Sequence, residues 1–589
     1  MNELVPAPVA LINHTAVFDL NTWLASPGRF NPLHIMSGPG SGKSRLVGRG
    51  TAYRDFICGI PQMIIDPTGG TINNFIDKLN HIAPDFEHRW WAQYHQPLPP
   101  AWVHAIEQHL KHLADRLIYV DMSGQAGSPL YYRLAEDESL FDMSQRFLEI
   151  IRRLDPALES ATVEGWNALY RLGTYVGMIL SALDLQITEA EDLIRNPEQW
   201  QGRFDQALAR YPEVLPAVVF FREFIRKPDL RARRSDSFLT KILAFSADPT
   251  LAVMFGTNTR SVNAETLVHN KQTALLDYSK IHNADRRRML MLWGTSEALT
   301  YAKFRGTAGR KQPLALVIDE VSQILGYQSS GQSIMAADIE DLVSVVARNY
   351  GLWLTVIHQN LTQLDRRIQA ALMQGNQIIG VIPNPEDAEL LARYFFRYDP
   401  YWVKKKIPVW MGMASDPYYD PVYDGAGIQI DHVSTRTTPT IIDYTTEEFS
   451  IPEQLQLLTQ AIQALPRFQF LVRASGIEGQ LAAPLQRLDI SALDRDQYPD
   501  EARVAEACQR LAKRSGLANK ADVLAEIKQR TTKPLKKKPM KDTDKSATLN
   551  DTSHGTPATA NQSAPTVPVL STPTPGRESR ETRDEQVFQ

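Results

Sequence analysis

The chain has 589 residues, of which 43% are hydrophobic and 22% charged, and its formal net charge is −4. This composition is that of an ordinary globular protein, and the length allows several structural units. The slightly negative charge counts against a protein that simply coats DNA. Any binding to nucleic acid has to come from local basic surfaces, because the field of the whole molecule does not favour it.

Cysteine content and hydropathy indicate the compartment in which the protein is found. Cys58 and Cys508 are the only cysteines and lie far apart, which fits a reducing compartment and excludes both a disulfide framework and a cysteine-based metal site. No apolar stretch approaches the roughly 18 residues that span a bilayer, and the N-terminus has no signal-peptide pattern. We expect a soluble, cytoplasmic protein, with a peripheral position at the inner face of the membrane as an alternative.

A glycine-rich segment near the N-terminus follows an apolar run and opens a predicted helix. Glycines allow successive backbone N–H groups to converge on a phosphate, with the positive end of the helix behind them. In such a loop Lys43 reaches the β- and γ-phosphates and the Ser44 hydroxyl binds Mg²⁺. Ser37 stands where Gly or Ala is usual. The predicted ATP-binding residues are Gly38, Pro39, Gly40, Ser41, Gly42, Lys43 and Ser44.

Buried strands and helices alternate over much of the chain. After the phosphate loop, strands are predicted at Gln62–Gly70, Arg116–Asp121, Thr273–Tyr278, Pro313–Glu320, Leu352–Ile357 and Gln377–Ile382. Such alternation predicts an α/β fold with a parallel sheet covered by helices on both faces. The ligand of such a sheet lies at the carboxyl ends of its strands.

A helical pattern interrupts this alternation from about residue 138 to 235. Phe147, Ile150, Ile151 and Leu154 follow the i, i+3, i+4, i+7 spacing of one buried helix face, and Trp166 begins a second set. We interpret this stretch as an all-α insertion within the nucleotide-binding domain.

One predicted strand ends in two adjacent acids, Asp319 and Glu320. Asp319 would hold Mg²⁺ through its water shell, and Glu320 would orient and polarise the attacking water. Kinase- and GTPase-type loops often lack the second acid, so the pair favours an ATP hydrolase of the additional-strand class. Taken alone, the two acids could equally be a polar strand end or a helix cap.

The C-terminal third carries weaker signals. Residues 401–423 predict a loop or hairpin, 453–488 a helix followed by short strands, and 502–527 a helical hairpin with its turn at Ser515 and Gly516. From about residue 531 the chain is rich in Lys, Pro, Ser and Thr and predicts a disordered tail. The expected domains are an N-terminal extension (1–33), the nucleotide-binding domain in two parts (34–137 and 236–490), the all-α insertion (138–235), the helical hairpin (491–530) and the tail (531–589).

The order of these motifs resembles a known superfamily. The phosphate loop, the Asp-Pro-Thr-Gly turn at 66–69, the acidic strand and the segment His358–Leu364 are similar to those of the HerA/FtsK superfamily, above all its TraG/TraD-type conjugative coupling ATPases. The similarity covers roughly residues 30–475. It implies a RecA-like P-loop core and a homohexameric ring that pumps single- or double-stranded DNA. Relaxosome or secretion-channel proteins of a type IV secretion system are the implied partners.

The resemblance gives roles to two further residues. Gln359 matches the polar sensor of the γ-phosphate, and its alternative is a strand-end amide bonded to a loop. Arg348 matches an arginine that reaches the nucleotide of the neighbouring subunit, where it would neutralise charge in the transition state. Its alternative is a solvated arginine at a helix end, and Arg305 and Arg310 are the other candidates for the role in trans.

The chain also departs from the coupling-protein pattern. It lacks the N-terminal membrane helices usual in this family, and Thr68 stands where Lys is common. No basic run identifies a DNA contact, since such runs are more often solvated faces. The candidates are Arg231, Arg233, Arg234, Arg286–Arg288, Lys404–Lys406, Lys533 and Lys536–Lys538. Six histidines between His81 and His112 have irregular spacing, which favours solvated side chains over a metal site.

Three functions remain open at this point. The first is an ATP-driven DNA translocase or coupling protein of conjugative transfer. The second is a soluble HerA-like DNA-processing motor in repair or phage defence. The third is a nucleotide-switched assembly protein that does not pump DNA, against which the complete set of hydrolytic residues counts.

Overall fold

The computed structural model describes residues 19–24, 27–125, 139–154, 163–257, 262–325, 347–364, 366–423, 425–427, 429–474, 486–491 and 500–532. The chain divides into two units, residues 1–533 and 534–589, and the second lies outside the described residues. The predicted disordered tail therefore falls almost wholly outside them.

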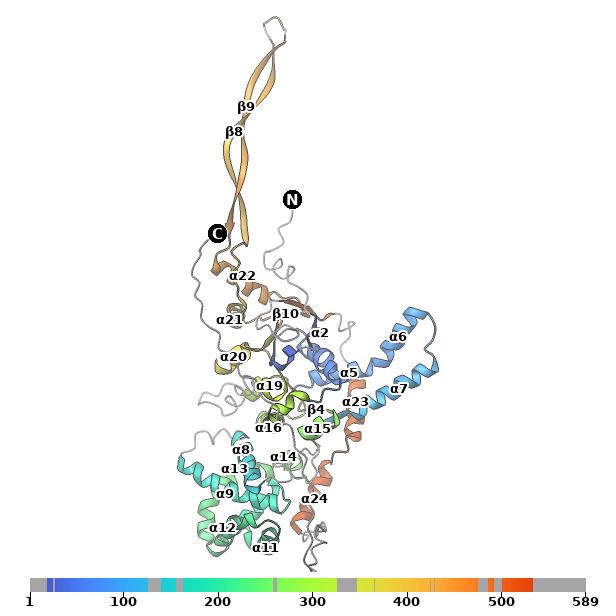
Figure 1. The fold of residues 1–589 in the computed structure, drawn as a ribbon, viewed down its shortest axis with the longest axis vertical. Helices are drawn as coiled ribbons and strands as arrows, with labels where there is room; N and C mark the ends of the chain where they lie inside the picture. The colour runs from blue at the N-terminus through green and yellow to red at the C-terminus, as the bar shows by residue number, and fades with distance from the viewer. Residues whose placement is uncertain are drawn as a thin grey trace, which may run out of the picture. The chain divides into compact units, whose positions relative to one another are not determined.

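A sheet forms the centre of the described chain, with its strands in the order β11-β10-β7-β1-β6-β5-β2-β4-β3 (Figure 1). The strands from β7 to β3 are parallel, whereas β10 is antiparallel to β7 and to β11. Their bounds are β1 Leu33–Met36, β2 Gln62–Asp66, β3 Leu117–Asp121, β4 Thr273–Asp277, β5 Leu314–Ile318, β6 Leu352–His358, β7 Asn376–Ile379, β10 Gln469–Arg473 and β11 Gln486–Asp489.

The predicted α/β class is confirmed, and each strand predicted between residues 62 and 382 is present. Strand β6 lies between β1, which leads into the phosphate loop, and β5, which leads into the two acids. This extra strand is the feature that defines the additional-strand class of P-loop NTPases, so the RecA-like arrangement expected from the motifs is confirmed.

Strand register brings the predicted site to one edge of the sheet. Met36 pairs with His358 in β6, and Ile318 pairs with Ile65 in β2. The residues that directly follow these strands therefore meet at the carboxyl edge, where a parallel sheet binds its ligand.

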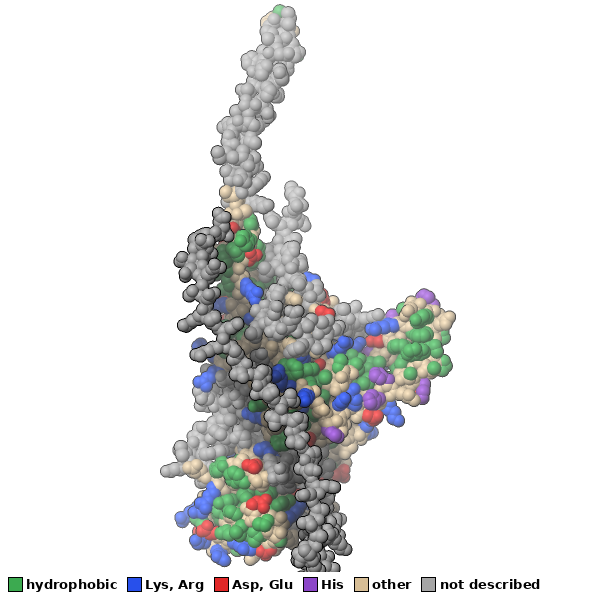
Figure 2. Space-filling view, in the orientation of Figure 1, with side chains coloured by type: hydrophobic (Ala, Val, Ile, Leu, Met, Phe, Trp, Pro, Cys, Tyr) green, Lys and Arg blue, Asp and Glu red, His purple; other side chains and the backbone are tan. Residues whose placement is uncertain are grey.

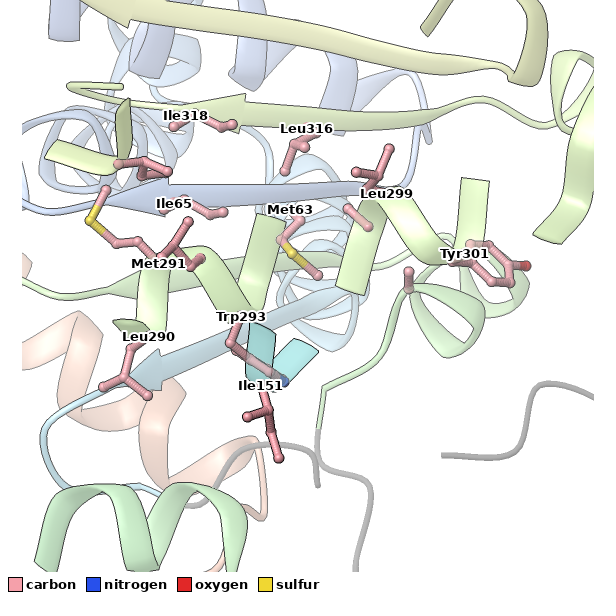
Figure 3. Close-up of a cluster of buried hydrophobic side chains, with 14 of the residues drawn as sticks. Met63, Ile65, Ile151, Leu290, Met291, Trp293, Leu299, Tyr301, Leu316 and Ile318 are labelled. Carbon is pink, nitrogen blue, oxygen red and sulfur yellow. The ribbon is translucent and has the colours of Figure 1, made fainter. Parts of the chain in front are cut away.

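Helices bury both faces of the sheet. Alternate strand residues point to opposite faces, and both sets are inaccessible to solvent: Ile65 and Ile318 belong to one core cluster, Ile64 and Val317 to the other. Helix α16 (Ala284–Arg305) covers the first face with Met291 and Trp293, as Figure 3 shows. On the other face, Phe56 and Phe75 stack edge to face at 5.4 Å between ring centres.

The described residues between β3 and β4 are mainly helical. Phe147 and Ile151 are buried as predicted, and Leu169 of the second set is buried too, whereas the side chains of Ile150, Leu154 and Trp166 lie outside the described set. The α-helices are α8 Leu140–Leu154, α9 Val163–Ala182, α10 Ala190–Arg195, α11 Gln201–Arg210, α12 Leu215–Arg226, α13 Pro228–Ala247, α14 Pro249–Phe255 and α15 Ala264–Asn270.

The remaining helices lie before β3 and after β4. They are α2 Leu20–Leu24, α3 Lys43–Arg45, α4 Ala52–Ile57, α5 Gly70–Asn80, α6 Ile82–Tyr94, α7 Pro100–Asp115, α17 Ser322–Leu325, α19 Ala347–Tyr350, α20 Arg366–Met373, α21 Pro385–Phe395 and α22 Ile451–Gln463. None of the described helices is by itself long and apolar enough to cross a membrane; only the pair α13 and α14, bent by 90°, passes that test together.

One long β-hairpin and two further helices lie in the C-terminal third. β8 (Val403–Tyr423) and β9 (Gln429–Glu448) pair as a long antiparallel hairpin (Figure 1). The loop or hairpin predicted for residues 401–423 is instead one strand of this hairpin, because its partner comes from the following residues. Helices α23 (Glu501–Arg514) and α24 (Lys520–Thr532) flank Ser515 and Gly516. The Arg530 guanidinium in α24 binds the buried Glu189 carboxylate at 2.8 Å, which ties α24 to the insertion.

Candidate nucleotide site

The phosphate loop connects β1 to α3 and depends on its glycines. Gly40 and Gly42 have φ angles of +73° and +107°, which favour glycine. A Cβ on Gly42 would lie 2.7 Å from the Phe468 ring, and one on Gly38 would lie 2.8 Å from Pro383. The loop is therefore a close-packed cradle that a side chain would fill, as a phosphate site requires.

The departure at Ser37 is accommodated by the neighbouring strand. Its hydroxyl donates a hydrogen bond to the Val381 carbonyl at 3.1 Å. A side chain on Gly380 would collide with that hydroxyl. Serine at the first position therefore leaves the loop intact, because the opposite residue has no side chain.

Lys43 opens α3, which continues through a π-helical turn (Leu46–Thr51) into α4. Its ammonium donates to the carbonyls of Ser37 and Gly38, the latter at 2.9 Å. Burial lowers the pKa of Lys43, and the nearby Glu320 and Asp319 carboxylates oppose this shift. The predicted lysine and the predicted acids therefore lie within electrostatic reach of one another.

Asp319 is buried directly after β5 and is held by a residue that the sequence did not reveal. The Thr71 hydroxyl in α5 donates to its Oδ2 at 2.7 Å. Burial raises the pKa of Asp319, and the neighbouring Asp66 carboxylate raises it further. Asp66 ends β2 and accepts from the backbone N–H groups of Gly69 and Ile72.

Asp66 and Thr71 differ in how well the sequence alone could have indicated them as site residues. Asp66 ends a predicted strand, so its place at the carboxyl edge follows from the parallel sheet. The contact of Thr71 with Asp319 depends on β2 lying beside β5, and no local pattern states that order. Thr68, which replaces a common lysine, donates to Asp66 from its backbone at 2.9 Å and its hydroxyl at 3.0 Å.

Glu320 and Gln359 are in direct contact, although 39 residues separate them. The Gln359 amide donates to Glu320 Oε2 at 2.8 Å, and the Ser322 hydroxyl donates to Oε1 at 2.5 Å. Glu320 has a φ of +51°, in the left-handed region that non-glycine residues rarely adopt. Such backbone strain is found mainly at functional sites, where the surrounding structure holds it in place.

The donor set fits a nucleotide with Mg²⁺. Ser44 faces the loop after β2, since a Cβ on Gly70 would lie 3.2 Å from its Oγ. A serine hydroxyl and a carboxylate such as Asp319 are the hard oxygen ligands that Mg²⁺ prefers. The cradle at Gly38–Gly42 would hold the phosphates, and Lys43 supplies a positive charge beside them.

The three arginine candidates precede β5 and β6 in the chain. They therefore lie at the amino ends of these strands, whereas the predicted nucleotide site lies at the carboxyl ends. Arg348 belongs to α19, directly before the seven-residue strand β6, and its side chain is outside the described set. Strand β6 is about 23 Å long at about 3.3 Å per residue, so Arg348 cannot reach the nucleotide site of its own chain. Arg305 donates to the Gln312 carbonyl at 2.6 Å, and Arg310 lies over the Phe30 ring at 5.6 Å, both before β5.

A buried histidine pair lies in the strands that lead into the site. His34 in β1 and His358 in β6 hydrogen-bond to each other through their Nε2 atoms. Gln377 in β7 contacts His34 Nδ1 at 2.7 Å, and His358 Nδ1 lies 3.1 Å from the Asn360 carbonyl. Burial lowers the pKa of both rings, that of His34 to about 4.

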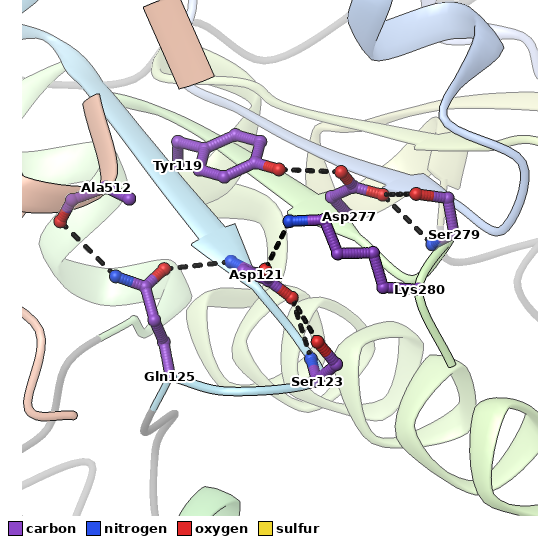
Figure 4. Close-up of polar contacts among 8 residues, drawn as sticks. All are labelled: Tyr119, Asp121, Ser123, Gln125, Asp277, Ser279, Lys280 and Ala512. Atoms are coloured by element: carbon purple, nitrogen blue, oxygen red, sulfur yellow. Dashed lines mark hydrogen bonds and ion pairs between the residues drawn. The ribbon is translucent and has the colours of Figure 1, made fainter. Parts of the chain in front are cut away.

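A polar cavity of about 440 Å³ lies at the carboxyl ends of β3 and β4. In Figure 4, Tyr119 donates to Asp277 at 2.6 Å, and Lys280 forms an ion pair with Asp121 at 2.6 Å. Burial and Asp277 raise the pKa of the Tyr119 hydroxyl. Ser279 donates to Asp277 and packs against Gly69, which connects this cluster to the loop after β2.

Most of the described basic candidates have acidic or carbonyl partners. Arg231 pairs with Glu198 at 2.6 Å, and Lys404 pairs with Glu453 at 2.6 Å. Arg286 pairs with Asp248, and Arg287 donates to a carbonyl. Arg233 and Arg234 are exposed, whereas the side chains of Lys405, Lys406 and the tail lysines lie outside the described residues. Among the described residues, no cluster of His, Cys, Asp and Glu could hold a metal ion.

No family model and no curated protein matches this chain. Among solved structures, it is similar to the bacterial conjugative coupling protein TrwBdeltaN70 in an unbound monoclinic form and in a trigonal form with sulphate. It is also similar to the plasmid coupling protein TrwB in complex with a non-hydrolysable ATP analogue. Each match has 13% identity and a TM-score of 0.41, and covers 81–83% of this chain and 88–96% of the other.

Glu320→Gln should separate nucleotide binding from hydrolysis. The amide keeps the size of the side chain but loses the carboxylate that would polarise water, so we expect turnover to fall by about 10²–10⁴. Binding of ATP should stay unchanged, because Lys43 and the loop are intact. Phosphate release measures turnover, and nucleotide titration measures ATP binding. Glu389→Gln, at an exposed carboxylate, is the matched control; wild-type turnover in the Glu320 variant would contradict the assignment.

The histidine pair should make the protein less stable in mild acid. The pKa of His34 is about 4 in the folded state and about 6.5 in the unfolded chain, so stability is complete above pH 6.5 and falls as the pH drops towards 4. The loss is about 3 kcal/mol for His34 alone.

Urea unfolding of wild type and His34→Gln between pH 7.5 and 4.5 measures this loss. The variant should lose less stability over that range than wild type does. The control His269→Gln removes an exposed histidine and should follow wild type. Parallel curves for wild type and His34→Gln would exclude a buried neutral His34.

Proposed function

We propose that this chain is an ATPase that couples ATP hydrolysis to DNA translocation, of the conjugative coupling type, and that it acts as a ring. The observation that supports hydrolysis most is the placement of Glu320. It follows Asp319 at the carboxyl edge of the sheet, is bonded by Gln359 and Ser322, and lies within electrostatic reach of Lys43.

Each residue of the site has a separate task in this proposal. Lys43 and the loop N–H groups hold the phosphates, while Ser44 and Asp319 hold Mg²⁺, which neutralises charge on the phosphates when bound. Glu320 orients and polarises the attacking water. Gln359 holds Glu320 through its amide nitrogen, and a γ-phosphate competing for that amide would report nucleotide state to β6.

The proposal of a ring depends on the position of the arginines. An arginine supplied to a phosphoryl-transfer site raises the rate by about 10³–10⁵ in related chemistry. Arg348 lies at the far edge of its own sheet and can serve only a site on another copy. Arg305 and Arg310 share this edge and remain the alternatives.

DNA and secretion-channel partners enter the proposal through the motif resemblance. The second candidate, a HerA-like motor in repair or phage defence, would have the same site and differs in its partners. The third, a switch that binds ATP without pumping DNA, is disfavoured by the Gln359–Glu320 contact, because a switch does not need a positioned catalytic carboxylate.

ATP hydrolysis should be stimulated by DNA. We expect phosphate release by the full chain to rise several-fold with single- or double-stranded DNA, and the mass in solution with ATP to be that of a multimer. Lys43→Ala is the control that removes nucleotide-dependent activity. A monomer whose hydrolysis ignores DNA would exclude both motor functions and leave the switch.

Arg348→Ala should abolish hydrolysis, and mixing this variant with Glu320→Gln subunits should restore part of it. If the arginine acts on the neighbouring subunit, a ring containing Arg348→Ala and Glu320→Gln subunits holds some interfaces with an intact Glu320 facing an intact Arg348. Mixing two inactive variants should therefore restore part of the activity. Arg393→Ala, at an exposed ion pair, is the matched control. Failure of every mixture, or normal turnover by Arg348→Ala alone, would reject Arg348 for this role.

A further inference from the structure

Helices α6 and α7 form a two-helix arm between α5 and β3, and Figure 1 shows them side by side. His95 ends α6 in the left-handed conformation, and only residues 95–99 connect the helices. Phe86 and Trp90 in α6 pack against the Trp102 ring of α7, with ring centres 5.8 and 6.1 Å apart. The arm is therefore held together by its own aromatic side chains.

The end of this arm exposes further large apolar side chains. Trp91 is 55% exposed and Tyr94 49% in α6, and Trp102 is 48% and Val103 41% exposed in α7. Helix α6 has no buried residue. Figure 2 shows hydrophobic side chains gathered with histidines over this arm. Trp91 and Tyr94 are three residues apart and so share one face of α6.

Charge is absent from the same region. The segment from Trp90 to Ile106 contains no Asp, Glu, Lys or Arg, in a chain whose charged fraction is 22%. A nucleic acid needs cations to neutralise its phosphates, and this segment contains no lysine or arginine. A strongly charged protein partner is disfavoured for the same reason. The chemistry that fits is a neutral, partly apolar surface.

The size of the patch argues against a second copy of the chain. An aromatic side chain buries about 150–250 Å² when it is fully covered. About half of each of the three aromatic side chains is exposed, so the patch offers roughly 300–400 Å² of surface for burial. A stable protein interface buries about 800 Å² on each partner. A bilayer sets no such threshold, since affinity for its surface grows with the apolar area inserted.

We propose that the end of the α6–α7 arm, which comprises Trp91, Tyr94, Trp102 and Val103, binds the surface of a phospholipid bilayer. Tryptophan and tyrosine favour the membrane–water interface, where the ring is apolar on one side and hydrated on the other. Helices of 13 and 16 residues are shorter than the roughly 20 residues of a spanning helix, so the arm inserts into the headgroup region.

Co-sedimentation of the full chain with phosphatidylcholine vesicles at pH 8 tests this proposal. We expect binding that changes little between low and high salt, because no charges take part. Trp91→Ser combined with Val103→Ser should weaken it at least tenfold, while Trp90, Phe86 and Trp102 keep the arm folded. The matched control is Phe304→Ser with Tyr401→Ser, which removes exposed aromatics at 52% and 85% elsewhere. Quenching of tryptophan fluorescence by brominated lipid should decrease in the arm variant and persist in the control.

Four results would overturn the proposal. The first is a failure to sediment with neutral vesicles. The second is binding only to anionic vesicles that salt abolishes, which would point to basic residues. The third is a change in the mass of the arm variant without any effect on vesicles, which would make a second copy the occupant. The fourth is weaker binding of the arm variant to single-stranded DNA, with vesicle binding unchanged. Basal ATP hydrolysis should be equal in all variants, so this test is independent of the proposed function.

Discussion

The burial of two carboxylates at one edge of a parallel sheet is the constraint on which the rest of this site depends. Asp66 and Asp319 end neighbouring strands, and burial raises the pKa of both. Buried charge is costly unless hydrogen bonds or cations compensate it. Backbone N–H groups hold Asp66, the Thr71 hydroxyl holds Asp319, and Lys43 supplies the neighbouring positive charge. In the proposed mechanism, Mg²⁺ binds at this edge.

The extra strand determines how the second acid is used. Because β6 lies between β1 and β5, the residue after β6 comes beside the residue after β5. As a result, the Gln359 amide donates a hydrogen bond to Glu320, and this contact helps to hold the left-handed backbone conformation of Glu320. Rigid, strained positions of this kind keep a catalytic group oriented before the substrate arrives. The position of the carboxylate proposed to activate water therefore depends on the sheet order as much as on the acidic pair.

The two edges of the sheet have different parts in the proposed mechanism. The carboxyl edge holds the nucleotide groups, whereas the arginine candidates precede β5 and β6 at the amino edge. A strand of seven residues separates them, so in the proposed mechanism the arginine serves the site of another copy. A closed assembly of identical copies brings the two edges together, since each copy offers a different edge to each neighbour. The α6–α7 arm lies outside this arrangement, with a surface chemistry of its own.

The sequence by itself determined the phosphate loop, the acidic pair, the α/β class and the positions of the strands, because glycine geometry, apolar runs and strand-end acids are local signals. The resemblance of the motifs to a known superfamily also marked Gln359. Only the tertiary structure decided which strands are neighbours, and with that the contacts of Thr71 with Asp319 and of Gln359 with Glu320. The tertiary structure also decided that Gly380, which has no side chain, lies opposite the Ser37 hydroxyl, and that Trp91 is exposed. Contacts between residues far apart in the chain depend on strand order and packing, and no local pattern of residues encodes these.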